Sequence, residues 1–557
     1  MTTFLEGATP WPTDLAASYR AKKYWLGQTI GDFLHERAQQ HGQQIALICG
    51  ERQFSYAALD RQVNQFAVVL QQQGFGANDR VVLQLPNIAE FFIAYFATIR
   101  LGMLPVMALP AHRLVEISSF IAQTQACLYI CADRHLGFDY RQLARQCQQR
   151  CPSLKTVMVV GEAQEFLGWH PLMAAMEWPY SCKPAHTPNA ASQVAFFQLS
   201  GGSTGTPKLI PRTHDDYLYS VRTSAAICRL DTSSRMLMVL PVAHNFSLSS
   251  PGSLGILVVG GTVVLAKDPA PSGAFTLVRQ HQITHVALVP ALAVSWTSHI
   301  EQTGNNVLAQ LKTLQVGGAR LPDVLARKII VQYQCPLQQV FGMAEGLVNY
   351  TRHDDSTETI VTTQGRPISP DDEIKVVNDD DQAVAAGEIG HLLTRGPYTI
   401  HGYYQADAHN TNAFTSDGFY RTGDLVRLTH DGNIVVEGRS KDQINRGGEK
   451  IATEEVEQAL AQHSQVVQAA LVAMPDAVLG EKSCAYIIWQ SDANTNSKNH
   501  SPVRRGMQLR QFLHDYGLAT FKIPDRIEFI DQFPFTALGK IDKKILRQSL
   551  LEKASVA

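Results

Sequence analysis

Apolar and polar positions along the first 110 residues change repeatedly between helical and strand spacing. The pattern predicts a hairpin that turns at Gly50, followed by a strand, a helix and a second strand in the order of a parallel βαβ unit. The predicted elements are helices over residues 30–41, 56–74 and 89–101, a hairpin over 44–55, and strands over 80–85 and 104–109.

The same alternation returns after residue 234. It predicts strands over 235–240, 262–265, 285–289, 313–316 and 338–341, with helices over 273–281 and 291–301. Strands that alternate with helices favour a largely parallel, doubly wound α/β architecture, in which ligands gather at the carboxyl ends of the strands.

From Gly387 the pattern changes to short strands separated by turn signals. The polar, glycine-bearing stretch 440–451 suits a hinge, and the segment beyond it predicts a small α+β domain. The elements expected there are helices over 453–462 and 507–516 and strands over 467–472, 483–490 and 526–530. We therefore expect a large domain over residues 1–440 and a small mobile domain over 441–557, joined at Lys441.

Composition narrows the class of protein. Hydrophobic residues make up 45% of the chain, charged residues 18%, and the net charge is −2, so neither nucleic acid nor a membrane is an expected partner. Nine scattered cysteines without a CxxC pair indicate reduced thiols in a cytoplasmic protein. The N-terminus lacks a basic region followed by an apolar core, so no signal peptide is expected. The most apolar run, 91–109, contains Arg100, Gly102 and Pro105, and predicts a helix, a turn and a strand.

The stretch LSGGSTGTPK, residues 199–208, is the strongest candidate for chemistry. It lies between the apolar run 195–200 and the apolar pair Leu209 and Ile210, which predicts a polar hairpin between two strands. Its glycine N–H groups, its hydroxyls and its lysine suit a polyphosphate, although it departs from the GxxxxGK[ST] phosphate loop. The residues concerned are Ser200, Gly201, Gly202, Ser203, Thr204, Gly205, Thr206 and Lys208.

Two further glycine clusters follow predicted strands. Gln315 and Val316 lead into GGAR, residues 317–320, and Val340 and Phe341 lead into GMAEG, residues 342–346. Phe341 offers a face for a base ring, and Glu345 offers an oxygen ligand for Mg²⁺. Asp424, in YRTGDL, is a carboxylate that a tight turn would hold against ribose hydroxyls.

Five motifs in this order resemble the adenylate-forming superfamily of acyl-CoA synthetases, peptide-synthetase adenylation domains and luciferases. They are LSGGSTGTPK, GMAEG, YRTGDL, GRSKDQINRGGEKI and PFTALGKID, and together they cover nearly the whole chain. The segment PVAHNFSLSSPG, residues 241–252, most resembles the stand-alone aryl acid ligases that make 2,3-dihydroxybenzoyl adenylate for catechol siderophores. The resemblance implies an N-terminal domain of doubly wound sheets plus a distorted β-barrel, with a mobile C-terminal domain.

The resemblance also implies roles for individual residues. Lys540 would bridge the acid carboxylate and the α-phosphate, Lys441 would be the hinge, and Glu449 and Lys450 would serve the second half-reaction. ATP would be bound by the loop residues above, by Gly317, Gly318, Ala319, Val340, Phe341 and Gly342, and by Asp424 and Arg439. Glu345 would hold Mg²⁺. The aryl acid would contact His244, Asn245, Phe246, Ser250, Gly317, Met343 and Val348.

The implied reaction joins 2,3-dihydroxybenzoate to AMP and then transfers the aryl group to the phosphopantetheine thiol of an aryl carrier protein, a step of nonribosomal peptide synthesis. Asn245 stands where amino-acid-activating relatives carry Asp. An amide cannot compensate a buried ammonium, but it can hydrogen-bond a phenolic hydroxyl. Salicylate-activating relatives tend to have Cys and Leu where this chain has Ser250 and Val348, which favours the dihydroxy acid.

Alternatives stay open at this point. His244 is either a ligand of the acid or a core histidine with a structural role. A salicylate-AMP ligase and an aryl-CoA ligase of the same fold are alternatives. A non-catalytic nucleotide-binding module is disfavoured, because Lys208, Glu345, Asp424 and Lys540 are all present. Family members often have Tyr and Thr where this chain has Phe341 and Ala344.

Overall fold

The computed structural model describes residues 4–175, 191–200, 207–439, 443–490, 501–534 and 541–556. The backbone divides into two compact units. The first contains Met1–Pro110, Phe120–Ser200 and Lys208–Gly438; the second contains Ala111–Ser119, Gly201–Pro207 and Arg439–Ala557.

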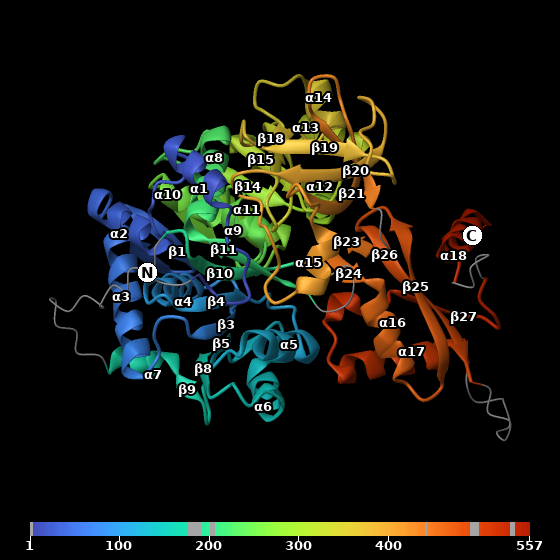
Figure 1. Ribbon diagram of the computed structural model, residues 1–557, viewed down its shortest axis with the longest axis horizontal. Coiled ribbons are helices and arrows are strands. Elements are labelled where there is room, and N and C mark those ends of the chain that lie inside the picture. The colour runs from blue at the N-terminus through green and yellow to red at the C-terminus, as the bar shows by residue number, and fades with distance from the viewer. Residues whose placement is uncertain are drawn as a thin grey trace. The chain divides into compact units, whose positions relative to one another are not determined.

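The first unit contains two large, mostly parallel sheets (Figure 1). The seven-stranded sheet has the order β11 (Leu209–Thr213), β10 (Val194–Leu199), β4 (Leu104–Met107), β3 (Arg80–Gln84), β5 (Leu128–Ala132), β8 (Thr156–Val160), β9 (Leu167–Gly168). The nine-stranded sheet has the order β18 (Arg366–Pro367), β17 (Val348–Tyr350), β16 (Leu337–Gly342), β15 (Thr313–Gly317), β14 (His285–Leu288), β12 (Arg235–Met238), β13 (Thr262–Leu265), β1 (Ile45–Cys49), β2 (Arg52–Ser55). The predicted parallel arrangement is confirmed, and it is divided between two sheets.

Helices cover these sheets and fill the space between them. One hydrophobic core contains side chains of both sheets and of helices α2, α3, α4, α8 and α10, while a second core packs α11, α12 and α13 on the nine-stranded sheet. The helices are α1 (Thr13–Ala21), α2 (Ile30–Gln40), α3 (Tyr56–Gln72), α4 (Ala89–Arg100), α5 (Leu114–Thr124), α6 (Tyr140–Arg150), α7 (Trp169–Ala174), α8 (His214–Ile227), α9 (Asn245–Ser249), α10 (Gly252–Val258), α11 (Pro271–Gln280), α12 (Pro290–Thr303), α13 (Asp323–Tyr333), α14 (Thr357–Thr362) and α15 (Asp407–Ala413).

Several helices begin where the sequence supplies a cap. Thr29 and Asp32 form a capping box at the start of α2, and Thr213 and Asp216 form another at the start of α8. The apolar run 91–109 folds as predicted, because all of α4 is buried and a turn leads from it into β4. No helix among the described residues is long and apolar enough to cross a bilayer.

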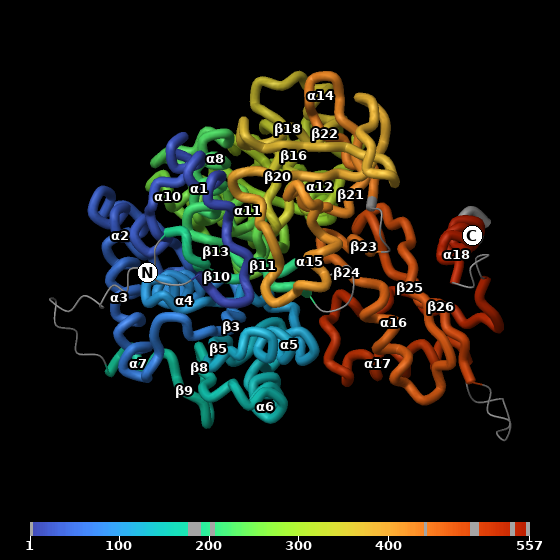
Figure 2. The backbone as a smooth tube through the Cα atoms, viewed as in Figure 1, coloured from blue at the N-terminus to red at the C-terminus, as the bar shows by residue number. Residues whose placement is uncertain are grey.

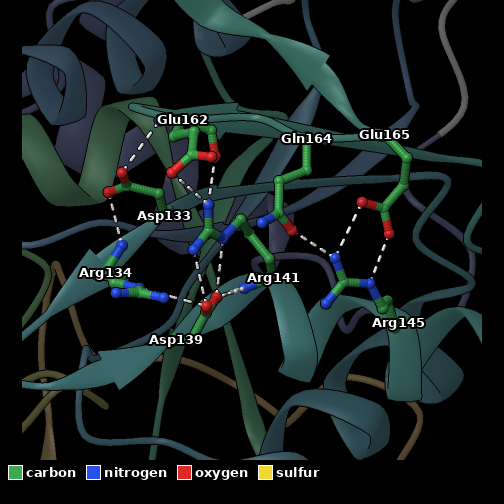
Figure 3. A network of polar contacts seen from close by, with 8 residues as sticks. All are labelled: Asp133, Arg134, Asp139, Arg141, Arg145, Glu162, Gln164 and Glu165. Atoms are coloured by element: carbon green, nitrogen blue, oxygen red, sulfur yellow. Dashed lines mark hydrogen bonds and ion pairs between the residues drawn. The ribbon is translucent and has the colours of Figure 1, made fainter.

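A hydrogen-bond network ties α6 to the edge of the seven-stranded sheet (Figure 3). The guanidinium of Arg141 is buried and donates to both carboxylate oxygens of Asp139 and to the carbonyl oxygen of Glu162. The Arg141 guanidinium holds the pKa of the Asp139 carboxyl well below its usual value. Every charge in this network has a partner, so we assign it a structural role.

The remaining sheet of the first unit has the order β19 (Glu373–Val377), β20 (Gly390–Arg395), β21 (Tyr420–Leu428), β22 (Ile434–Arg439). The resemblance implied a distorted barrel here. The described residues instead form an open four-stranded sheet, because β19 and β22 are its two edges and do not pair with each other.

The second unit is the predicted α+β domain. Its sheet has the order β24 (Glu449–Ala452), β23 (Gln443–Arg446), β26 (Gly480–Trp489), β25 (Val466–Asp476), with β27 (Arg526–Phe529) beside β26. Successive residues of β25 and β26 point to opposite faces. One face packs on α16 (Thr453–Ala461) and α17 (Pro502–Tyr516), and the other packs on α18 (Lys543–Val556) (Figure 2).

Candidate active site

The predicted hairpin that carries LSGGSTGTPK is present. Strands β10 and β11 pair antiparallel, with Leu199 opposite Leu209. Ser200 and Lys208 close the hairpin with two hydrogen bonds, each 2.9 Å long. The Ser200 N–H donates to the Lys208 carbonyl, and the Lys208 N–H donates to the Ser200 hydroxyl. Gly201, Gly202, Ser203, Thr204, Gly205 and Thr206 lie outside the described residues.

The two glycine clusters lie side by side at the carboxyl ends of neighbouring parallel strands. Strands β15 and β16 pair in register, with Gly317 opposite Val340. Gly318, at φ +82°, and Gly342 are both exposed. This edge brings together the residues expected around adenine: Gly317, Gly318, Ala319, Val340, Phe341 and Gly342. The glycines of this edge have no side chain, so a flat ring can approach their backbone closely.

Glu345 lies in the short connection between β16 and β17. Its residue surface is 7% exposed, and its Oε1 accepts a 2.8 Å hydrogen bond from the hydroxyl of Tyr403. No cluster of three or more metal-binding side chains occurs in the described part of the chain. Mg²⁺ that arrives with ATP needs only one or two protein carboxylates, because phosphate oxygens and water complete its shell. A single buried carboxylate therefore fits this ion.

Asp424 departs from the predicted tight turn. It lies within strand β21, where residues 422–424 stand opposite Leu392 because the register shifts between His391 and Leu393. Gly423 has φ +75°, which allows the strand to bulge at this point. The bulge, together with a hydrogen bond from the Asp424 N–H to the Thr422 hydroxyl, fixes a buried carboxylate within a strand. The side chain of Arg439 lies outside the described residues.

The acid-binding candidates begin at helix α9. His244 is its N-cap, and the imidazole Nδ1 accepts the N–H of Phe246 at 3.2 Å, which is a structural use of this histidine. The amide Oδ1 of Asn245 accepts from the hydroxyls of Tyr217, at 2.9 Å, and Ser249, at 3.3 Å. These two hydroxyls fix the orientation of the Asn245 amide.

The other acid-binding candidates converge on the same place. A side chain added at Gly317 would meet Phe246 at 3.0 Å, and one added at Gly342 would meet Val348 at 3.3 Å. Ser250 is hydrogen-bonded to Phe246 through the backbone at 3.2 Å. Met343 and Val348 are buried, at 7% and 4% exposure. The structure thus brings the predicted adenine edge and the predicted acid pocket against each other.

In the second unit, Glu449 and Lys450 lie on strand β24 of a tight hairpin. Gly447 and Gly448 form its turn with positive φ values, and Arg446 beside it pairs with Asp525 at 2.7 Å. Burial raises the pKa of the Glu449 carboxyl to about 6. Lys441 and Lys540 lie outside the described residues.

Sequence reasoning missed a buried network behind the loop that carries Glu345. The guanidinium of Arg212 donates to the carbonyl oxygens of Ala344, at 2.6 Å, and Tyr398, at 3.1 Å. The hydroxyl of Tyr398 accepts the Val348 N–H at 3.1 Å and donates to Asp372 at 2.7 Å. The only sequence signal was an arginine in an otherwise apolar strand, and it had no visible partner.

Asp372 makes stability depend on pH. Burial raises the pKa of its carboxyl to about 7, whereas the unfolded chain has an ordinary carboxyl value of 3.8, so the folded state binds the extra proton between these values. Stability therefore falls as pH rises from about 4 through 7, by up to about 4 kcal/mol. We expect Asp372→Asn to flatten this fall between pH 5 and pH 8.

Thermal unfolding at the two pH values measures the effect, with Asp380→Asn as a control for loss of an exposed charge. Equal pH slopes in the wild type and Asp372→Asn would contradict the assignment.

Comparison with known proteins finds similar sequences along nearly the whole chain. The AMP-binding enzyme family matches residues 34–404, and the AMP-binding enzyme C-terminal domain matches residues 455–540. The chain is 52% identical to the 2,3-dihydroxybenzoate-AMP ligase of Bacillus subtilis, covering 99% of this chain and 98% of the relative. It is 51% identical to the vibriobactin-specific 2,3-dihydroxybenzoate-AMP ligase of Vibrio cholerae, covering 97% of each.

Among solved structures, the apo structure of Mycobacterium smegmatis MbtA matches with a TM-score of 0.75 and 41% identity, over 99% of this chain and 100% of that one. The family model matches most of the chain, and the relatives are similar along nearly its full length. The chain belongs to the AMP-binding enzyme family.

Proposed function

We propose that the chain is a 2,3-dihydroxybenzoate-AMP ligase. It joins the acid to AMP with release of pyrophosphate and then transfers the aryl group to the thiol of an aryl carrier protein in siderophore biosynthesis. The observation that carries the proposal is that Phe246 lies against Gly317 and Val348 lies against Gly342, so the candidate acid-binding residues adjoin the proposed adenine edge. Relatives that share about half of their residues with this chain are named for this activity.

In the first half-reaction a carboxylate oxygen of the acid attacks the α-phosphorus of ATP, and the bond to pyrophosphate breaks. Two anions meet at that atom, so positive charge has to offset their repulsion. We assign this to Lys540, and the binding of the β- and γ-phosphates to Lys208 with the Ser200–Thr206 loop. Mg²⁺ held by Glu345 would neutralise phosphate charge when it is bound.

Asp424 binds the ribose hydroxyls in this proposal, and Arg439 assists at the ribose and phosphate. The adenine lies against Phe341 and the backbone of Gly317, Gly318, Ala319, Val340 and Gly342. The acid lies among Asn245, Phe246, Ser250, Met343 and Val348, and His244 shapes this site by capping α9.

In the second half-reaction the phosphopantetheine thiol attacks the aryl carbonyl and loses its proton, and the bond to AMP breaks. We propose that the domain beyond residue 440 turns about Lys441, so that Glu449 and Lys450 replace Lys540 at the site. ATP use and the buried free thiols of Cys131, Cys228 and Cys335 support a cytoplasmic location.

Ser250 and Val348 set the choice of acid. Both are buried, and a pair that is smaller and more polar than Cys and Leu leaves room and a hydrogen-bond partner for a hydroxyl at carbon 3. An acid that lacks this hydroxyl leaves a pocket group unmatched, at a cost of about 1 to 3 kcal/mol. We expect Ser250→Cys combined with Val348→Leu to narrow or invert the preference for 2,3-dihydroxybenzoate over salicylate. Pyrophosphate exchange with each acid measures it, and an unchanged ratio would contradict the role of this pair.

The acceptor separates this function from that of an aryl-CoA ligase. The purified chain, ATP, Mg²⁺ and 2,3-dihydroxybenzoate are incubated with either a phosphopantetheinylated aryl carrier protein or free coenzyme A, and the thioester is detected by mass spectrometry. We expect acylated carrier protein to form much faster than aryl-CoA. Preferential formation of aryl-CoA would overturn the proposed acceptor and leave the adenylation chemistry standing.

A further inference from the structure

The loop 343–347 between β16 and β17 has few bonds of its own. Within it, the Met343 N–H donates to Leu347 and the Gly346 N–H donates to Met343. Yet this loop carries Glu345, the proposed metal ligand, and leads into Val348, a proposed pocket residue. Groups that must be placed accurately need support from rigid neighbours.

Besides Arg212, which bonds the Ala344 carbonyl, one segment supplies such support. Residues 398–403, here called the support segment, run beside the loop. The Ile400 N–H donates to the Glu345 carbonyl at 2.8 Å. A side chain added at Gly346 would collide with Thr399 at 2.5 Å, so loop and segment are in direct backbone contact.

The N-terminal residues contact the support segment at His401 and the chain on either side of it at Pro397 and Gln405. The indole N–H of Trp25 donates to the Pro397 carbonyl at 3.0 Å, and the Gln405 N–H donates to the Gly7 carbonyl at 2.8 Å. The rings of Trp11 and His401 lie 4.6 Å apart, edge to face. The segment is therefore a fixed platform.

Two buried tyrosines of the support segment, Tyr398 and Tyr403, form hydrogen bonds with different parts of the candidate site. At one end, Tyr403 donates its only hydroxyl proton to Glu345, so the hydroxyl oxygen can accept from Tyr420 at 2.8 Å. In this chain the Tyr420 hydroxyl donates to Tyr403 and the Tyr403 hydroxyl donates to the Glu345 carboxylate, so each hydrogen bond strengthens the next. The ammonium of Lys208 lies 6.0 Å from the centre of the Tyr403 ring, so this tyrosine also lies beside the phosphate hairpin.

At the other end, Tyr398 bonds the backbone that carries the acid pocket. Its hydroxyl accepts from the N–H of Val348 and donates to Asp372, which fixes both of its hydrogen-bonding directions. Burial raises the pKa of the Tyr398 hydroxyl well above its usual value, so this hydroxyl stays protonated.

We propose that Tyr403 is a positioning residue for the metal carboxylate Glu345, and that Tyr398 is a positioning residue for the acid-pocket residue Val348. The Tyr403 hydroxyl thus orients the part of the loop that serves the nucleotide, and the Tyr398 hydroxyl orients the part that serves the acid. This inference rests on the proposed function for the metal-binding role of Glu345, the acid-binding role of Val348 and the identity of the acid.

The test compares Tyr403→Phe with Tyr398→Phe, each of which removes one hydroxyl. ATP binding is measured by calorimetry at a series of Mg²⁺ concentrations without acid, and binding of 2,3-dihydroxybenzoate is measured separately. We expect Tyr403→Phe to raise the Mg²⁺ needed for half-maximal ATP binding about tenfold, the size of one hydrogen bond to a carboxylate, and to leave acid binding within about twofold. Tyr398→Phe should do the reverse.

Tyr404→Phe is the matched control, because Tyr404 is a buried neighbour whose hydroxyl meets the side chain of Gln405. Equal losses of both kinds of binding in the two variants, or an unchanged Mg²⁺ requirement in Tyr403→Phe, would overturn the division of roles. Should Tyr403→Phe fail to fold, Tyr420→Phe decides instead: a raised Mg²⁺ requirement supports the proposal, and an unchanged one overturns it. If the wild type binds Mg²⁺–ATP but not 2,3-dihydroxybenzoate, the acid assignment fails and the Tyr403 result still stands.

Discussion

Replacing Glu345 by Gln should lower acid-dependent pyrophosphate exchange by about 100-fold or more at millimolar Mg²⁺. Glutamine keeps the size of the side chain and an oxygen that can accept the Tyr403 hydrogen bond, but it removes the negative charge. An amide oxygen is a weaker ligand for a hard cation than a carboxylate. Exchange should therefore recover in part as the Mg²⁺ concentration is raised.

The control is Glu358→Gln, which removes an exposed carboxylate of α14 that is paired with Arg327 of α13. It should leave exchange unchanged at every Mg²⁺ concentration. Wild-type rates for Glu345→Gln at low Mg²⁺ would show that this carboxylate does not hold the metal.

Replacing Lys540 by Ala should nearly abolish adenylation and leave thioester formation from supplied aryl adenylate largely intact. The lysine offsets the repulsion between the acid and the α-phosphate, and that repulsion exists only in the first half-reaction. Exchange measures the first step, and transfer from synthetic adenylate to the carrier protein measures the second.

Lys544→Ala is the matched control, because Lys544 is an exposed lysine of α18 close in sequence. It should change neither step. Equal loss of both half-reactions in Lys540→Ala would refute a role confined to adenylation.

Local patterns in the sequence predicted the elements that frame the site. Helical spacing located α2, α3 and α4 to within two residues at each end, and apolar runs located β15 and β16, whose parallel pairing then placed Gly317 beside Val340. These features depend on periodicity and on rules of α/β topology, both of which are readable from one chain.

Features that depend on contacts between distant parts of the chain could not be predicted from the sequence. Arg212 meets Ala344 and Tyr398 only because β11 folds beside segments more than a hundred residues away. Residues 543–547 are mostly basic, yet Leu546 among them is buried on the sheet of the second unit and makes α18 an amphipathic helix. The bulge at Gly423 arises from pairing with β20, so YRTGDL looked like a turn.

The most direct test of the account is pyrophosphate exchange by the wild-type chain with 2,3-dihydroxybenzoate, salicylate, benzoate, an aliphatic acid and an amino acid. We expect 2,3-dihydroxybenzoate to be preferred over salicylate, and salicylate over benzoate, per unit concentration, with little exchange for the other two. Preference for salicylate, or for the aliphatic or amino acid over all three, would contradict it.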